Sequence, residues 1–295
     1  MTLDRRSLVF AAAATVAAAP AGQAKSVGEH GLFWKATAPG KAPCTLFGYA
    51  RMAAAAAPGV VTDGTAFIAQ CDRVITDGPN LDIQGPTASR VQLSPISNRI
   101  PAYLAARIHA LFEGRLVEGL EPAQLSAVEV MFLLTAEGEA STTPQIGVAI
   151  AEPALTAGKP LSYLLSADEY LSGRELVDLP ALNRRMDGDM VAYLFALRDK
   201  VGPIGRYEQG LYAERRIGDL AKLRSEMKSR GVVSSTEALG LHSETIVALR
   251  AQRTHETVQN ATKTAFVILP VGALTEEDGI LTKLRKAGVE IAMMA

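Results

Sequence analysis

Apolar and polar positions divide the chain into two strand-rich ends and a helical middle. Near the start, apolar segments cover 32–38 and 44–50 with a Pro39-Gly40 turn signal between them, which predicts a hairpin or strand pair. A helical stretch over 61–71 leads to a further apolar segment, 73–78. A strand, a crossover helix and a second strand favour parallel pairing, so 44–50 and 73–78 are expected to be parallel neighbours.

The middle of the chain carries helical spacing. Apolar residues recur at this spacing after Pro101, and Ser166 and Glu169 have the spacing of a capping box at a helix start, which Ser234 and Glu237 repeat. Segment 160–165 resembles a short buried strand. One helix is expected over 122–135, and another is expected to end near residue 158. Two or three charged amphipathic helices are expected over 187–230, and a long helix over 243–261.

The C-terminal region returns to strand and helix alternation. We expect a buried strand over 265–272, a helix over 277–287 and a last strand over 289–294. Alternating units of this kind predict an α/β fold with a mixed central sheet, built from the N- and C-terminal parts, and a helical middle that covers a cleft. Residues 25–295 are expected to form a single domain.

The first residues have the layout of an export signal. Arg5 and Arg6 precede an apolar run over 8–19 and then small residues, which predicts a signal peptide over 1–24. The arginine pair also fits the twin-arginine type. The apolar run is short for a membrane anchor, and no later segment reaches transmembrane length. The protein is therefore expected to be exported, periplasmic or secreted, without a transmembrane segment in its mature form.

Composition limits the classes of partner and of site. Formal net charge is −1 and aromatic residues make up 5 % of the chain, which argues against nucleic-acid binding. The cysteines, Cys44 and Cys71, lack the spacing of a thiolate metal site. In an oxidising compartment they are candidates for a disulfide, and the alternative is two small buried apolar residues.

Five segments carry a resemblance to a known family. They read, in order, LFWKATAPG, LFGYARM, CDRVITD, GVAIAEPALTAGKPLSYLLSADEYL and FVILPVGALTEEDGILTKLRKAGVEI. From about residue 31 to the end, the chain resembles the TraB/GumN family, which includes the Tiki proteases and lies within the erythromycin-esterase and ChaN-like superfamily. The resemblance implies that Gly48, Tyr49, Arg51, Asp77, Arg253, Gly272 and Thr275 lie at a cleft.

The resemblance also shows what this chain lacks. In proteolytic members two Gly-x-x-His motifs are thought to hold a divalent metal with a nearby acid. Here the first histidine position is Arg51, the second is Thr275 or a two-residue gap beside it, and the acid is Asp77. A guanidinium has no lone pair to donate and repels a cation. We therefore expect no metal, no cofactor and a non-catalytic protein of the cell envelope.

The cleft admits two arrangements of its charges. Arg51 and Arg253 form a cationic pocket for a carboxylate or phosphate, or Arg51 pairs with Asp77 in place of the metal; a third alternative leaves Arg51 in solvent. Tyr49 caps the pocket or packs. The partner is then a small anionic ligand, a peptide or an envelope protein.

Two other functions remain open from the sequence. One is a metal-dependent peptidase or hydrolase with relocated ligands, which requires His242 or His255 to converge with Asp77 and another acid. The other is an envelope scaffold acting through a helical surface on 101–135. Of the other histidines, His109 shares an amphipathic helix with charged residues and reads as structural, and His30 lies away from both strand-end glycines.

Overall fold

A computed structural model describes residues 31–78, 93–116, 121–138, 144–173, 178–233, 243–275 and 279–294. Its sheet has the order β4-β3-β5-β2-β1-β6. Strands β2, β5, β3 and β4 run parallel, and β1 is antiparallel to β2 and to β6. The expected α/β fold with a mixed sheet is confirmed. The strands are β1 (Phe33–Thr37), β2 (Cys44–Tyr49), β3 (Arg73–Thr76), β4 (Leu161–Tyr163), β5 (Ala265–Pro270) and β6 (Glu290–Met293).

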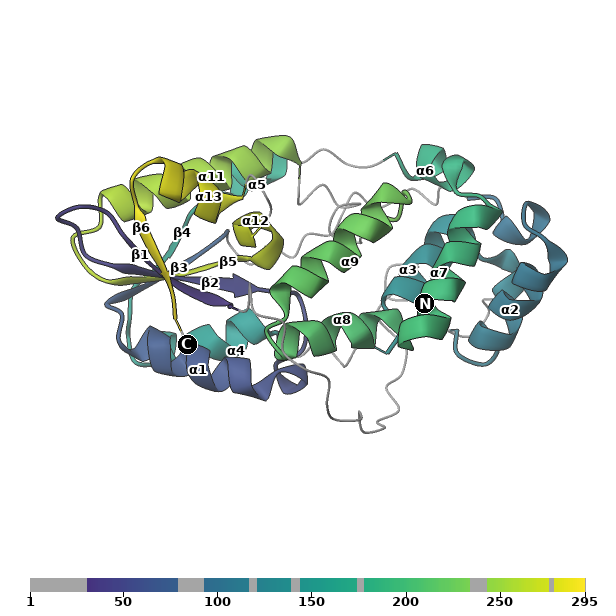
Figure 1. Cartoon of the computed structure of the whole chain (residues 1–295), viewed down its shortest axis with the longest axis horizontal. Coiled ribbons are helices and arrows are strands. Elements are labelled where there is room, and N and C mark those ends of the chain that lie inside the picture. Colours follow the sequence, from purple (N-terminus) through teal and green to yellow (C-terminus); the bar gives the residue numbers. More distant parts are fainter. Residues whose placement is uncertain are drawn as a thin grey trace.

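Helices cover both faces of the sheet (Figure 1). On one face lie α1 (Pro58–Ala69) and α4 (Ile146–Thr156), which contact each other. The close approach is marked at Gly64 of α1, where a Cβ atom would lie 2.5 Å from the Cδ1 of Ile150 on α4. The opposite face carries α5 (Ala167–Ser172), α11 (Glu244–Gln259), α12 (Val271–Thr275) and α13 (Ile280–Lys286).

A helical part lies beside the sheet and is formed by the middle of the chain (Figure 1). Its α3 begins at Ser126, whose side chain and that of Glu129 form a capping box. Its helices are α2 (Ala102–Phe112), α3 (Ala127–Thr135), α6 (Leu179–Arg185), α7 (Gly188–Val201), α8 (Ile204–Ala213) and α9 (Ile217–Ser229). Short 3₁₀ turns cover η2 (Ala54–Ala56), η3 (Ile96–Asn98) and η4 (Pro122–Gln124).

Three sequence-based expectations are corrected. The strands β2 and β3 are parallel but not neighbours, because the almost completely buried β5 lies between them. The segment expected as a buried strand, 160–165, forms β4 at the edge of the sheet, with all three strand residues exposed. The strand expected over 265–272 ends at Pro270, and the chain turns at once into α12.

Other expectations are confirmed or fall outside the described residues. Ser166 and Glu169 form the predicted capping box at the start of α5, and three helices cover most of 187–230. The signal peptide 1–24 and the Ser234–Glu237 signal lie outside the described residues. In the part of the chain that the structure describes, every helix is too short or too polar to cross a membrane.

Candidate functional site

The candidate site lies at the carboxyl edge of the parallel strands. Tyr49, the last residue of β2, pairs with Pro270, the last residue of β5, and Thr76 of β3 pairs with Ile268. Asp77 follows β3 directly, Arg51 comes two residues after β2, and α12 follows β5. The carboxyl ends of parallel strands meet at one edge, so the turn after β2 that carries Arg51 and the helix α12 that carries Gly272 begin at the same edge.

A buried ion pair occupies the centre of this edge. Arg250 of α11 donates from Nε to Oδ1 of Asp77 at 2.5 Å and from its Nη2 to Oδ2 at 2.8 Å. The same Nη2 is 3.2 Å from the hydroxyl oxygen of Tyr170 on α5. The side chains of Arg250 and Asp77 are 1 % and 7 % exposed. One of the alternatives left open by the sequence paired Asp77 with Arg51, and none included Arg250, which binds both oxygens.

The sequence offered a signal for Arg250 that the resemblance did not use. Ile246, Arg250, Thr254 and Val258 are all buried in α11 and recur every four residues, so Arg250 lies in the stripe that faces the sheet. A cation in such a stripe requires an acid, and Asp77 is the acid that follows the neighbouring strand. Burial, the largest single effect, lowers the pKa of Arg250, but the charge of Asp77, the hydrogen bonds to it and the two nearby tyrosines together raise the pKa on balance.

Two tyrosines and an arginine surround the pair. Loss of hydration, followed by the nearby carboxylate of Asp77, raises the pKa of both Tyr49 and Tyr170, whereas the positive charges of Arg250 and Arg51 act in the opposite direction. Both phenols therefore stay protonated at neutral pH. Arg51 is an exposed residue, so among the described residues of this edge it brings a positive charge to the surface.

The strand-end glycine has a packing role. A Cβ atom at Gly48 would lie 3.1 Å from Val271, 3.3 Å from Leu274 and 3.3 Å from Trp34, so α12 and the β1 tryptophan press on the backbone there. The Gly48 carbonyl accepts a 2.8 Å hydrogen bond from the buried hydroxyl of Tyr212. Gly48 therefore makes room for neighbouring side chains, and its lack of a Cβ atom is explained by this packing.

These residues do not fit a divalent cation. Both oxygens of Asp77 accept hydrogen bonds from Arg250, and Arg51 is a permanent cation without a lone pair to donate. The hydroxyl of Thr275, at the second histidine position, donates to the Val271 carbonyl within α12. Across the described ranges, no three His, Cys, Asp or Glu side chains gather as a metal centre requires.

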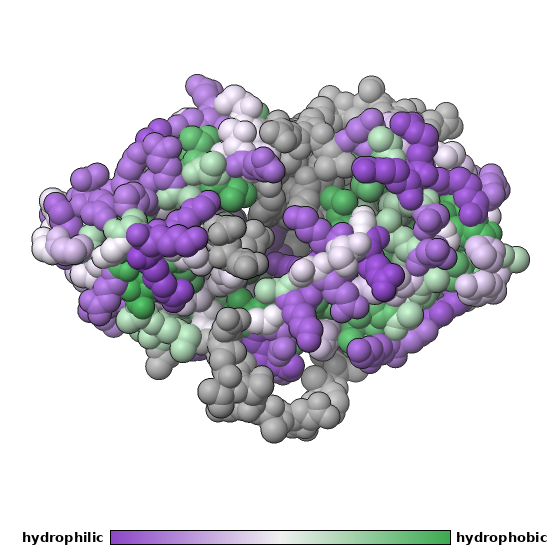
Figure 2. All heavy atoms as spheres, turned by 45° about the horizontal axis from the view of Figure 1, so that its top comes forward, coloured by the Kyte–Doolittle hydropathy of each residue, from purple (hydrophilic) through white to green (hydrophobic). Residues whose placement is uncertain are grey.

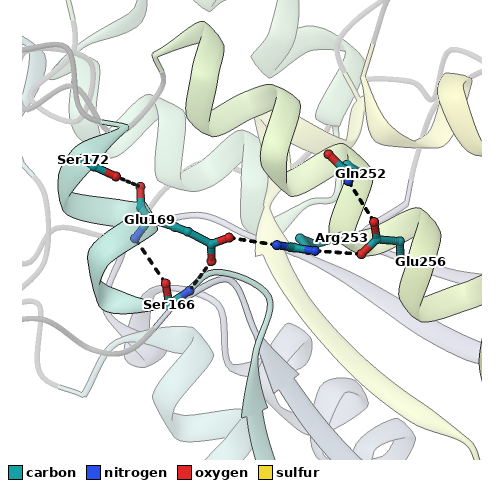
Figure 3. A network of polar contacts seen from close by, with 6 residues as sticks. All are labelled: Ser166, Glu169, Ser172, Gln252, Arg253 and Glu256. Atoms are coloured by element: carbon teal, nitrogen blue, oxygen red, sulfur yellow. Dashed lines mark hydrogen bonds and ion pairs between the residues drawn. The ribbon is translucent and has the colours of Figure 1, made fainter.

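Arg253 belongs to a second, more exposed network (Figure 3). Its two Nη atoms donate to Glu169 at 2.9 Å and to Glu256 at 3.0 Å. Hydrogen bonds from the Ser166 backbone N–H, then from Arg253, lower the pKa of Glu169 to about 2. Arg253 is thus bound by two carboxylates. The resemblance placed Arg253 at the edge of the sheet, but the arginine that lies there is Arg250, three residues earlier on α11.

Beside this network lies an open pocket of about 300 Å³. It opens between the sheet and the C-terminal half of α11. Its lining is formed by Arg73, Tyr163, Leu164, Arg253, Glu256, Thr257 and Asn260. Arg73, at the start of β3, was not singled out from the sequence.

The predicted disulfide is not formed. Cys44 and Cys71 are both buried free thiols. Cys44 packs in the core on the α11 face of the sheet and Cys71 in the core on the α1 face. Burial raises the pKa of the Cys44 thiol to about 11 and also raises that of Cys71, so both are poor nucleophiles. The alternative that the sequence left open, two small buried residues, describes them.

The described residues give little support to the other two functions considered from the sequence, a peptidase with relocated ligands and a scaffold acting through residues 101–135. His255 lies five residues after Arg250 on α11 and is therefore turned well away from the Asp77 side, and His242 lies outside the described residues. Of the large apolar side chains described within 101–135, Tyr103 is the exposed one. On the face shown in Figure 2, hydrophilic residues predominate and apolar ones form small separate patches.

Comparison with protein-family models, curated proteins and solved structures gives no match.

Proposed function

We propose that this chain is an exported, non-catalytic TraB/GumN-like protein of the cell envelope that binds a ligand or partner at the carboxyl edge of its sheet. The observation that carries the proposal is the bidentate pair between Asp77 and Arg250. The acid that a metallohydrolase would use to hold a cation is bound instead by the guanidinium of Arg250. Separating the two groups would leave two buried charges without a partner, which is costly. The scaffold is kept, and the exposed Arg51 offers a cationic contact for an anionic ligand or an acidic peptide.

Metal content and hydrolysis test the non-catalytic part. The purified protein is incubated with zinc or manganese, freed of excess ion and analysed for bound metal, and its action on a mixed peptide library is measured with and without a chelator. We expect no stoichiometric metal and no chelator-sensitive cleavage. Stoichiometric metal together with cleavage that the chelator abolishes would overturn the proposal and favour a peptidase with relocated ligands.

Arg51→Met tests the binding part. The substitution keeps the apolar stem of an exposed side chain and removes the charge, so the fold is expected to remain intact. Binding of an acidic peptide is compared with binding of the same peptide carrying amides in place of its carboxylates. We expect the acidic peptide to bind the unaltered protein more tightly than the amidated one, and Arg51→Met to remove that preference. Equal binding of both peptides by both proteins contradicts a role for Arg51.

A further inference from the structure

Arg73, which lines the pocket beside α11, has a side-chain nitrogen without a hydrogen-bond partner. The Nε of Arg73 is shielded from solvent and has no acceptor among the described residues. An N–H group buried without a partner costs stability, and native structures rarely keep one without a reason. Arg73 lines the pocket, so the outer part of its side chain can meet an acceptor that does not belong to the chain, although its Nε is closed to solvent.

The strand geometry explains why Arg73 lines this pocket. Successive side chains of a strand point to opposite faces of the sheet. Val74 belongs to the core on the α1 face and Ile75 to the core on the α11 face, so Arg73 shares the α11 face with Ile75. Its guanidinium also lies near enough to Cys44, on that same face, to lower the pKa of that thiol against the larger effect of burial.

Two other charged groups of the pocket, Arg253 and Glu256, differ from the Arg73 Nε in having partners. Arg253 is bound by Glu169 and Glu256, and Glu256 also accepts from Gln252. Thr257 and Asn260 add a hydroxyl and an amide to the lining, and both can donate to an oxygen. Further hydrogen-bond donors therefore line the pocket together with Arg73. The carboxylates of Glu169 and Glu256 already accept hydrogen bonds from Arg253.

We propose that this pocket binds an oxyanion, either a carboxylate or a phosphate, with Arg73 as its principal contact. Both ions accept two parallel hydrogen bonds from a guanidinium, and its two Nη groups present such a pair without the shielded Nε. The volume of about 300 Å³ suits a small molecule or the acidic end of a larger one. The site is distinct from the carboxyl-edge site around Arg51 and does not depend on it.

Titration calorimetry with inorganic phosphate and with glutarate tests the site. The proteins compared are the unaltered chain, Arg73→Met and Arg224→Met, a matched control that removes an arginine of α9, a helix that does not line the pocket. We expect one of the two anions to bind the unaltered protein and the control alike, and Arg73→Met to weaken that binding by about tenfold or more. The anion that binds identifies the group recognised.

A stability measurement separates a binding role from a structural one. Arg73→Met removes the buried unpartnered N–H, so its unfolding midpoint without anion is expected to equal or exceed that of the unaltered protein, and the bound anion is expected to stabilise the latter alone. The proposal is overturned if neither anion binds, or if Arg73→Met binds as tightly as the unaltered protein. Binding lost in Arg51→Met but kept in Arg73→Met likewise overturns it and assigns the anion to the carboxyl edge.

Discussion

Two arginines, three residues apart on α11, meet their acids in opposite surroundings. Arg250 binds Asp77 with both side chains almost fully buried, whereas Arg253 binds Glu169 with 39 % and 31 % of the side chains exposed. The donor and acceptor groups are the same and the distances are similar. Burial makes the difference: a pair in water is screened and replaceable, but a pair in the interior leaves an uncompensated charge when one member is removed.

This contrast explains which contact determines the architecture of the site. The Asp77–Arg250 pair joins the end of β3 to α11, and Tyr170 extends it to α5. It therefore fixes three elements around the carboxyl edge. The Arg253 network joins α5 and α11 at the surface (Figure 3), where each hydrogen bond competes with water. We infer that the first is indispensable to the fold and the second is adjustable.

The largest effect is expected from Arg250→Met. The substitution leaves the Asp77 carboxylate buried without its guanidinium, which costs about 3 to 5 kcal/mol of unfolding free energy. Urea unfolding measures it, and Arg253→Met is the matched control, because it makes the same replacement on the same helix at an exposed pair. We expect the control to shift the urea midpoint much less. Equal shifts would contradict the distinction between the two pairs.

Removing both members of the buried pair should be less harmful than the single changes suggest. In Arg250→Met with Asp77→Leu no buried charge is left unpaired, so the double variant is expected to be more stable than the sum of the single losses implies, by about 1 to 3 kcal/mol. A double-mutant cycle in urea measures this coupling. Additive losses would show that the two side chains act independently and that the pair is not the structural unit described above.

Some elements of the fold and some residues of the site could be predicted from the sequence, and others could not. The strands of both ends and the capping box at Ser166 follow from local pattern, and they were found. The insertion of β5 between β2 and β3 was not found, because local periodicity says nothing about which parallel strands become neighbours. The resemblance placed Arg253 at the cleft and, in one alternative, paired Asp77 with Arg51. It did not single out Arg250, which lies in the stripe of α11 that the structure buries. Gly48 was placed correctly but its packing role depends on α12, which the sequence did not predict.

A smaller effect is expected from Tyr170→Phe. It removes the hydroxyl that lies 3.2 Å from Arg250 but leaves the ring and the ion pair in place. One hydrogen bond to a buried side chain is worth about 1 kcal/mol, so the loss should be about a third of that for Arg250→Met. Urea unfolding of both variants under the same conditions gives the ratio. A loss as large as that of Arg250→Met would mean that the tyrosine, rather than Asp77, holds the guanidinium.

The smallest effect, and the one with a distinctive pH dependence, is expected from Glu169→Gln. The pKa of Glu169 lies at about 2, below its ordinary value of 4.5, because the ionised carboxylate accepts hydrogen bonds from Ser166 and Arg253. A depressed pKa in the folded state means that the unfolded chain takes up the proton first. The stabilising contribution is therefore present above about pH 4.5 and is lost as the pH falls towards 2.

Thermal unfolding across this range tests that sign. Glutamine keeps an oxygen that can accept from the Ser166 backbone, so the substitution removes the charge and retains much of the cap. The unaltered protein is expected to have a slightly higher midpoint than Glu169→Gln at neutral pH, and the gap should close through the acid window, where both side chains become uncharged. Added salt should narrow the gap at neutral pH, since the pair with Arg253 is exposed. A gap that persists at the lowest pH would assign the effect to the cap rather than to the charge.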